Sequence, residues 1–86
     1  MSVLVNTTTP LDAATYDQMI SALGATLKSA PGFRSHAAYP GPEGWLVTEI
    51  WDSAADHAAF FDAYVRNNLP PGVAPKVIEV HNAVMA

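Results

Sequence analysis

The chain has 86 residues, enough for one domain over residues 1–86, and no cysteine, which excludes disulfides, thiolate metal ligands and cysteine nucleophiles. Half of the residues are hydrophobic, 14% are charged and the net charge is −4, with scattered basic residues rather than the basic cluster that nucleic-acid binding requires. No apolar run reaches the ~18 residues of a membrane span, and the start lacks the features of a signal peptide, so we expect a cytoplasmic protein.

The first part of the chain predicts a strand followed by a helix. Residues 3–9 are rich in β-branched side chains and stop at Pro10, which is typical of a strand. Asp12 is a good N-cap, because its carboxylate can accept hydrogen bonds from the first free amides of a helix. Apolar residues then recur at three- and four-residue spacing over 13–30 and predict an amphipathic helix, which the following Pro-Gly pair ends.

The middle of the chain predicts an antiparallel hairpin. Residues 33–39 form a modest strand, and residues 45–51 form the strongest strand of the sequence. Residues 40–44 between them contain two prolines and two glycines, which favour a turn.

A second helix and a last strand complete the pattern. Ser53 followed by Asp56 is similar to a capping box, and the helix that it starts should end near residues 67–68. Three prolines keep residues 69–75 out of regular structure, and residues 76–84 predict the last strand.

This order of elements predicts an α+β, ferredoxin-like β-α-β-β-α-β fold, with a four-stranded antiparallel sheet and two helices on one face. The strand 45–51 places Leu46 and Ile50 on one side, and Val47 and both tryptophans of the chain on the other. A strand with large apolar groups on both faces is usually buried on both sides. We therefore expect a homodimer, a dimeric α/β barrel in which a second copy covers the open face, with a monomeric groove as the alternative.

The junctions between these elements resemble those of a known family. They are the Asp-capped helix after the first strand, the Pro31-Gly32-Phe33 entry to the second strand, and the Glu49-x-Trp51-x-Ser53 pattern before an aromatic helix. Together they are similar, over nearly the whole chain, to the antibiotic biosynthesis monooxygenase (ABM) domain of the dimeric α/β-barrel superfamily. These motifs are structural and do not define one reaction.

The superfamily that the chain resembles contains enzymes with different reactions, and their site residues can be compared with this sequence. Its haem-degrading branch uses an Asn on the first strand, and a Trp and then a His on the second helix. Asn6 matches the first of these, but the Trp position falls on Phe60 and no His follows His57 in the helix, so haem degradation is disfavoured. The quinone-forming branch uses pocket Asn, Trp, Tyr and Arg groups. Candidates of each type, without a position-by-position match, are Asn6, Trp51, Tyr64 and Arg34.

Three histidines carry the groups that change charge near neutral pH. His36 in the second strand and His81 in the last are candidate general bases, and Glu49 is the carboxylate that can orient one of them. Glu49 has a second interpretation, as the ion-pair partner of Arg34 on the neighbouring strand or as an inter-subunit contact. His57 is interpreted as structural. No His-x-His or His-x₃-His spacing occurs, so no metal site is expected.

We therefore expect a cofactor-independent monooxygenase that acts on a small aromatic or polyketide-like compound in an apolar pocket. A base would remove a phenolic proton, and the electron-rich anion itself would reduce O₂. The alternatives are a polyketide cyclase or isomerase of the same superfamily and a non-catalytic small-molecule-binding dimer. The expected catalytic residues are His36, His81 and Glu49. The expected substrate-binding residues are Asn6, Arg34, Trp51, Phe60, Tyr64 and Asn82, the asparagines because Asn is depleted in strands. No cofactor, nucleic acid or membrane partner is expected.

Overall fold

The structure is a computed structural model that describes residues 1–85. Its strands are β1 (Val3–Thr9), β2 (Phe33–Gly41), β3 (Gly44–Trp51) and β4 (Lys76–Glu79). Its helical segments are α1 (Ala13–Lys28), α2 (Ala54–Phe60), the π-helical turn η1 (Phe61–Val65) and the 3₁₀ turn η2 (Arg66–Asn68). No helix in this part of the chain is long and apolar enough to cross a membrane.

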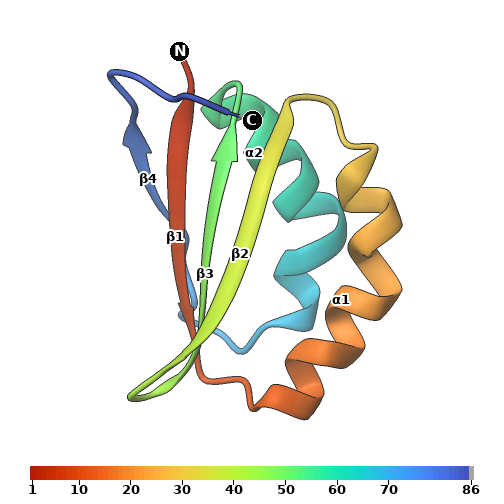
Figure 1. Cartoon of the computed structure of the whole chain (residues 1–86). Coiled ribbons are helices and arrows are strands. Elements are labelled where there is room, and N and C mark those ends of the chain that lie inside the picture. Colours follow the sequence, from red (N-terminus) through yellow and green to blue (C-terminus); the bar gives the residue numbers. More distant parts are fainter. Residues whose placement is uncertain (86) are drawn as a thin grey trace.

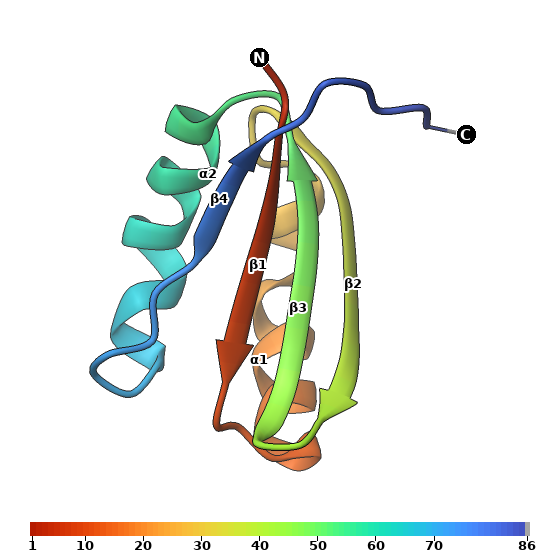
Figure 2. The ribbon, with the colours of Figure 1, turned by 90° about the vertical axis from the view of Figure 1, so that its left-hand side faces the viewer.

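The four strands form one antiparallel sheet in the order β2-β3-β1-β4, and both helices lie on the same face of it (Figure 1). After a 90° turn about the vertical axis, α1 lies behind the strands, α2 lies beside β4, and the C-terminal segment leads away from the sheet (Figure 2). The predicted α+β, ferredoxin-like fold is confirmed.

Both helices begin at the capping residues that the sequence predicts, Asp12 and Ser53. The Asp12 carboxylate accepts from the backbone N–H of Thr15 at 2.8 Å, and the Ser53 hydroxyl accepts from the N–H of Asp56 at 3.1 Å. Gly32, with a φ of +81°, turns the chain from α1 into β2, and a Cβ at this position would collide with the Asp56 carboxylate. The glycine therefore allows the start of α2 to pack against this loop.

Three element boundaries differ from the predictions. The first helix ends at Lys28 instead of continuing to residue 30, and the hairpin pairs Gly41 with Gly44 and needs only two turn residues. The last strand stops at Glu79 instead of running to residue 84. Glu79 lies opposite Val3, where β1 begins, so the chain beyond this point has almost no backbone left to pair with.

The core lies between the sheet and the helices. Alternate residues of β1 are buried on the helix side, from Val3 and Val5 onward, and they pack with Leu27, Trp51 and Phe60. Burial of these side chains supplies the main free-energy gain of folding.

The opposite face of the sheet also carries large apolar side chains, as the pattern of residues 45–51 predicts, beside polar ones such as Asn6 and Thr48. The register places Leu4 between Ile50 and Ile78, and Leu46 beside Tyr39. Tyr39 is 50% exposed and Ile78 is 40% exposed.

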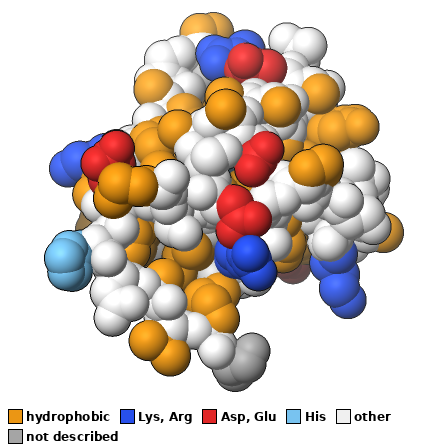
Figure 3. Space-filling view, turned by 90° about the horizontal axis from the view of Figure 1, so that it is seen from above, with side chains coloured by type: hydrophobic (Ala, Val, Ile, Leu, Met, Phe, Trp, Pro, Cys, Tyr) orange, Lys and Arg blue, Asp and Glu red, His pale blue; other side chains and the backbone are white. Residues whose placement is uncertain are grey.

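The end of the molecule that carries both termini has a mixed surface, with acidic and basic side chains among apolar ones (Figure 3). The ion pair between Arg34 and Asp52 joins the first residues of β2 to the end of β3. Both side chains of this pair are about half exposed, so it contributes little to stability.

Candidate active site

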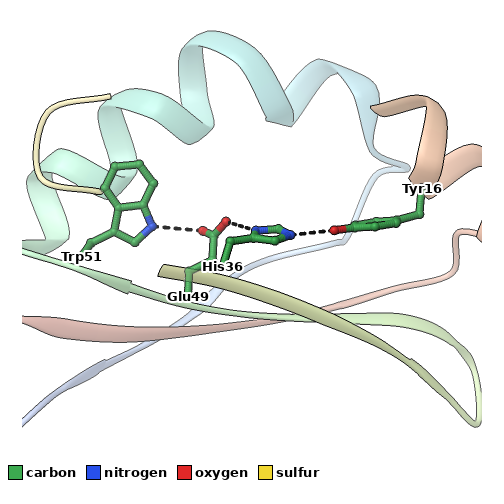
Figure 4. A network of polar contacts seen from close by, with 4 residues as sticks. All are labelled: Tyr16, His36, Glu49 and Trp51. Carbon is green, nitrogen blue, oxygen red and sulfur yellow. Dashed lines mark hydrogen bonds and ion pairs between the residues drawn. The ribbon is translucent and has the colours of Figure 1, made fainter. Parts of the chain in front are cut away.

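Four hydrogen-bonded side chains form a row between the sheet and the helices, from Trp51 beneath α2 to Tyr16 on α1 (Figure 4). The Tyr16 Oη lies 2.6 Å from His36 Nε2, and His36 Nδ1 lies 2.6 Å from Glu49 Oε2. Trp51 Nε1 donates to Glu49 Oε1 at 3.0 Å. We call these four residues the relay.

Strand register positions three of the four relay residues. The pairing of β2 with β3 sets His36 directly opposite Glu49. Trp51 follows Glu49 by two residues on the same strand and therefore points to the same, helix-covered face. Tyr16 lies in the first turn of α1 and reaches His36 from the helix layer, with the two rings end to end, nearly parallel and 6.2 Å apart between centroids.

The donors and acceptors fix where the protons lie. An indole N–H can only donate, and an ionised carboxylate can only accept, so both Glu49 oxygens act as acceptors. In the tautomer assigned from this network, His36 donates from Nδ1 to Glu49, and its Nε2 accepts the Tyr16 hydroxyl proton. An imidazole with a carboxylate on one nitrogen and an acceptor site on the other is the arrangement of a general base.

The site is shielded from water, which strengthens its electrostatic interactions. The side chains of His36 and Glu49 are 17% and 11% exposed. Burial raises the pKa of Tyr16 above its ordinary value, and the charge of Glu49 adds to this effect. The phenol of Tyr16 is therefore protonated at neutral pH.

A cavity of about 80 Å³ adjoins the relay between the sheet and the helices. Tyr16, His36 and Glu49 supply polar groups on one side of it. Its walls are otherwise mostly apolar. They come from α1, from α2 and the turns that follow it, and from the sheet. They include Met19, Ile20, Leu23, Leu27, Phe60, Phe61, Val65 and Leu69. Two of these residues, Phe61 and Val65, belong to the π-helical turn η1, a kind of element that is frequent at functional sites.

His57, which was interpreted as structural, also lines the cavity. Its ring packs against Trp51 and Phe61, with centroids 5.6 and 5.7 Å away. Burial lowers the pKa of His57 below its ordinary value, although Glu49 and Asp62 act in the opposite direction. His57 is therefore a neutral imidazole at neutral pH.

Four of the nine residues expected at the site come together on this face. His36, Glu49 and Phe60 line the cavity, and Trp51 is fully buried behind Glu49. The interpretation of Glu49 as the ion-pair partner of Arg34 is wrong, because Glu49 binds His36 and Trp51.

The other five expected residues lie outside the cavity. Asn6 is on the opposite face of the sheet, where it accepts from the Thr48 hydroxyl at 3.1 Å. Arg34 pairs with Asp52, and Tyr64 is 46% exposed beside the outer groove between the helices. The remaining two residues are exposed in the segment after β4: His81 and Asn82.

Tyr16 is the relay member that the sequence analysis missed, because it was counted only as part of the apolar stripe of the first helix. A tyrosine in such a stripe brings a hydroxyl that usually needs a partner when it is buried. That signal could have identified it. Within residues 1–85, no group of three or more His, Asp or Glu side chains is arranged to hold a metal ion.

Comparison with known proteins defines the fold. No family model and no curated protein matches the sequence. Among solved structures, the monooxygenase from the gene ActVA-Orf6 of Streptomyces coelicolor, in complex with nanaomycin D, has a TM-score of 0.60 and 19% identity over 99% of this chain and 91% of that one. SnoaB, a cofactor-independent oxygenase from Streptomyces nogalater, has a TM-score of 0.61 and 11% identity over 96% and 94%.

The haem degrader MhuD from Mycobacterium tuberculosis, with two haems bound, has a TM-score of 0.61 and 18% identity over 99% of this chain and 100% of that one. These structural neighbours are ABM-domain proteins, and the chain has their fold along nearly its whole length. Fold and site thus define a small α+β protein that shares the fold of these neighbours and has a mostly apolar cavity beside a partly buried Tyr-His-Glu relay.

Proposed function

We propose that this protein is a cofactor-independent monooxygenase that oxidises a small aromatic or polyketide-like compound in the cavity. The observation that carries the proposal is the His36–Glu49 pair, a mostly shielded imidazole–carboxylate pair that lines a largely apolar cavity. The two neighbours described as a monooxygenase and as a cofactor-independent oxygenase support it through their shared fold.

The reaction starts with loss of a phenolic proton. The proton ends on His36 Nε2, and Glu49 stabilises the resulting imidazolium through Nδ1. The phenolate is electron-rich and transfers an electron to O₂, and the phenoxyl radical and superoxide join at the para carbon to form a peroxide anion. This anion takes the proton back from His36 and becomes a hydroperoxide. His36 then removes the para proton, the O–O bond breaks, and the leaving hydroxide takes up that proton, which gives a quinone and water. The substrate supplies all four electrons, so the reaction needs no other reductant.

The cavity favours this chemistry by excluding water. Mostly apolar walls surround the space beside the relay, and a phenolate there is not stabilised by a hydration shell. The neutral ring of His57 offers a further polar group on the cavity wall.

Of the two expected bases, we assign the role to His36 and leave out His81, because His36 lines the cavity and His81 is exposed after β4. We also propose that a second copy of the chain covers the outer face of the sheet. The apolar side chains there favour this dimer: Leu4, Tyr39, Leu46, Ile50 and Ile78.

A cyclase or isomerase is the second candidate function, because a relay that takes up a proton can also return it to another atom of the substrate. A non-catalytic binding protein is the third. Haem degradation is disfavoured because the expected Trp position falls on Phe60 and no His follows His57 in the helix.

Oxygen uptake distinguishes these functions. Purified protein is mixed with electron-rich phenols of one to three rings in an oxygen electrode, next to the variant His36→Gln and the control variant His81→Gln. We expect protein-dependent uptake that falls by about 10²–10⁴-fold in His36→Gln and stays unchanged in the control. Product formation without oxygen uptake would indicate an isomerase or cyclase. Binding without any turnover would indicate a binding protein.

A further inference from the structure

The Tyr16 hydroxyl already forms a hydrogen bond with His36 Nε2, the nitrogen that we propose as the base. Its hydroxyl lies 2.6 Å from His36 Nε2, a distance that leaves no space for another group between the two atoms. A substrate proton therefore reaches His36 through the oxygen of Tyr16, or else Tyr16 must first move away. Tyr16 lines the cavity together with His36, so a path through its oxygen needs no movement of α1.

We propose that Tyr16 is the catalytic residue that contacts the substrate, and that the substrate is a single-ring phenol or enol whose hydroxyl donates to Tyr16 Oη. The substrate O–H bond breaks as its proton moves to Tyr16. At the same time the Tyr16 O–H bond breaks and its proton moves to His36 Nε2. One proton is transferred in total, and Tyr16 is neutral before and after the step. The catalytic part of this inference rests on the proposed function, whereas the binding part does not.

The unused hydrogen-bond acceptor sites of the relay fit Tyr16 as the residue that contacts the substrate. Tyr16 has one proton and donates it to His36, so the lone pairs of its oxygen are the acceptors that face outward from the relay. His36 and Glu49 use their own polar atoms within the relay. A neutral Tyr16 cannot deprotonate a substrate alone, but it can pass a proton on to the imidazole–carboxylate pair behind it.

The volume of the cavity sets the size of the substrate. An apolar cavity of about 150 Å³ holds one benzene molecule, and this cavity measures about 80 Å³. One ring therefore fits with adjustment of flexible side chains such as Met19 and Leu23, and a second fused ring needs a larger rearrangement of the walls. Mostly apolar walls with a few polar groups, among them Tyr16 and His57, favour a largely apolar ligand that carries a hydroxyl group.

The contact with Tyr16 is tested by binding of 4-nitrophenol without oxygen, followed through the visible absorbance of its phenolate. We expect Tyr16→Phe to bind at least about tenfold more weakly, since it loses one hydrogen bond to an ionising group, and to lose the phenolate band. 4-Nitrotoluene, which has no hydroxyl, should bind equally to both proteins. In the unaltered protein, the difference in affinity between 4-nitrophenol and 4-nitrotoluene tests the same hydroxyl contact without a substitution. Unchanged affinity and spectrum in Tyr16→Phe would overturn the role of Tyr16.

The size limit is tested with 4-nitro-1-naphthol, which adds one fused ring. We expect at least about tenfold weaker binding than for 4-nitrophenol, and Leu23→Ala, which enlarges the cavity, should remove most of this difference. The control Leu46→Ala removes a similar side chain from the opposite face of the sheet and should leave the preference unchanged. Equal binding of both phenols to the unaltered protein would overturn the single-ring assignment. If these results hold but no oxygen is consumed, the proposed function fails and the binding inference stands.

Discussion

Replacing Glu49 by Gln reverses the direction of two of the three hydrogen bonds in the relay, those of His36, without changing the shape of the relay. The Gln carbonyl can still accept from Trp51, but the amide group now faces His36 Nδ1 as a donor. His36 must therefore move its proton to Nε2 and donate it to the Tyr16 oxygen. Every hydrogen bond is kept, yet the nitrogen that accepted protons is now protonated.

The expected loss of stability is small. Hydrogen bonds to a charged group contribute about 1.5–3 kcal/mol and neutral ones about 0.5–1.5 kcal/mol, so weakening the two bonds to Glu49 costs about 2 kcal/mol in total. Removal of a buried charge offsets part of this cost, because the Glu49 side chain is 11% exposed. We expect Glu49→Gln to lower the free energy of unfolding by about 1–2 kcal/mol. Glu49→Ala should cost about 3–5 kcal/mol, since it leaves the buried Trp51 N–H unpaired and opens a void.

Activity should respond far more strongly than stability, with a fall of about 10²–10⁴-fold in Glu49→Gln. Urea unfolding followed by tryptophan fluorescence measures the free energies. Long-range ¹⁵N–¹H correlation spectra of the His36 ring show which nitrogen carries the proton. We expect Nδ1–H in the unaltered protein and Nε2–H in Glu49→Gln. The same tautomer in both proteins would refute the assigned direction of the relay.

Three further predictions concern pH, the loop before β2 and the outer face of the sheet. Burial lowers the pKa of His57, so below its ordinary value of 6.5 the unfolded chain binds a proton that the folded chain does not. The free energy of unfolding should fall as the pH drops below about 6.5, by at most about 1.4 kcal/mol per pH unit, and His57→Gln should remove this part of the slope in urea titrations. Gly32→Ala should destabilise by about 1–3 kcal/mol in the same assay, because of its positive φ and the collision with Asp56, and an unchanged midpoint would contradict this. Ile50→Lys should shift sedimentation from a dimer to a monomer while leaving the circular dichroism spectrum intact; a monomeric unaltered protein would contradict the proposed dimer.

Features that depend on local sequence could be predicted, and those that depend on pairing with a distant strand of the chain could not. The caps at Asp12 and Ser53 are local and are confirmed. The length of the last strand depends on where β1 begins, because pairing ends at the Glu79–Val3 pair. The sequence has a strand-like composition up to residue 84. It does not show where β1, the strand that pairs with β4, begins.

The site could be predicted only in part, for the same reason. His36 and Glu49 were both candidates, but their direct pairing follows from a two-residue turn between Gly41 and Gly44, and the prolines suggested a longer one. Asn6 lies on the wrong face because it is adjacent to the buried Val5, and successive residues of a strand point to opposite sides. The contact of Tyr16 depends on how α1 is rotated against the sheet, which periodicity does not define.

Oxygen-18 labelling tests most directly whether this cavity is an oxygenase site. Protein and an electron-rich single-ring phenol with a free para carbon, such as 2-methoxyphenol, are incubated under ¹⁸O₂, and the product is analysed at once by mass spectrometry. We expect one labelled oxygen in the quinone, formed by the unaltered protein and by His81→Gln but about 10²–10⁴-fold more slowly by His36→Gln. An unlabelled product, or labelling at the same rate in all three proteins, would contradict oxygenation through His36.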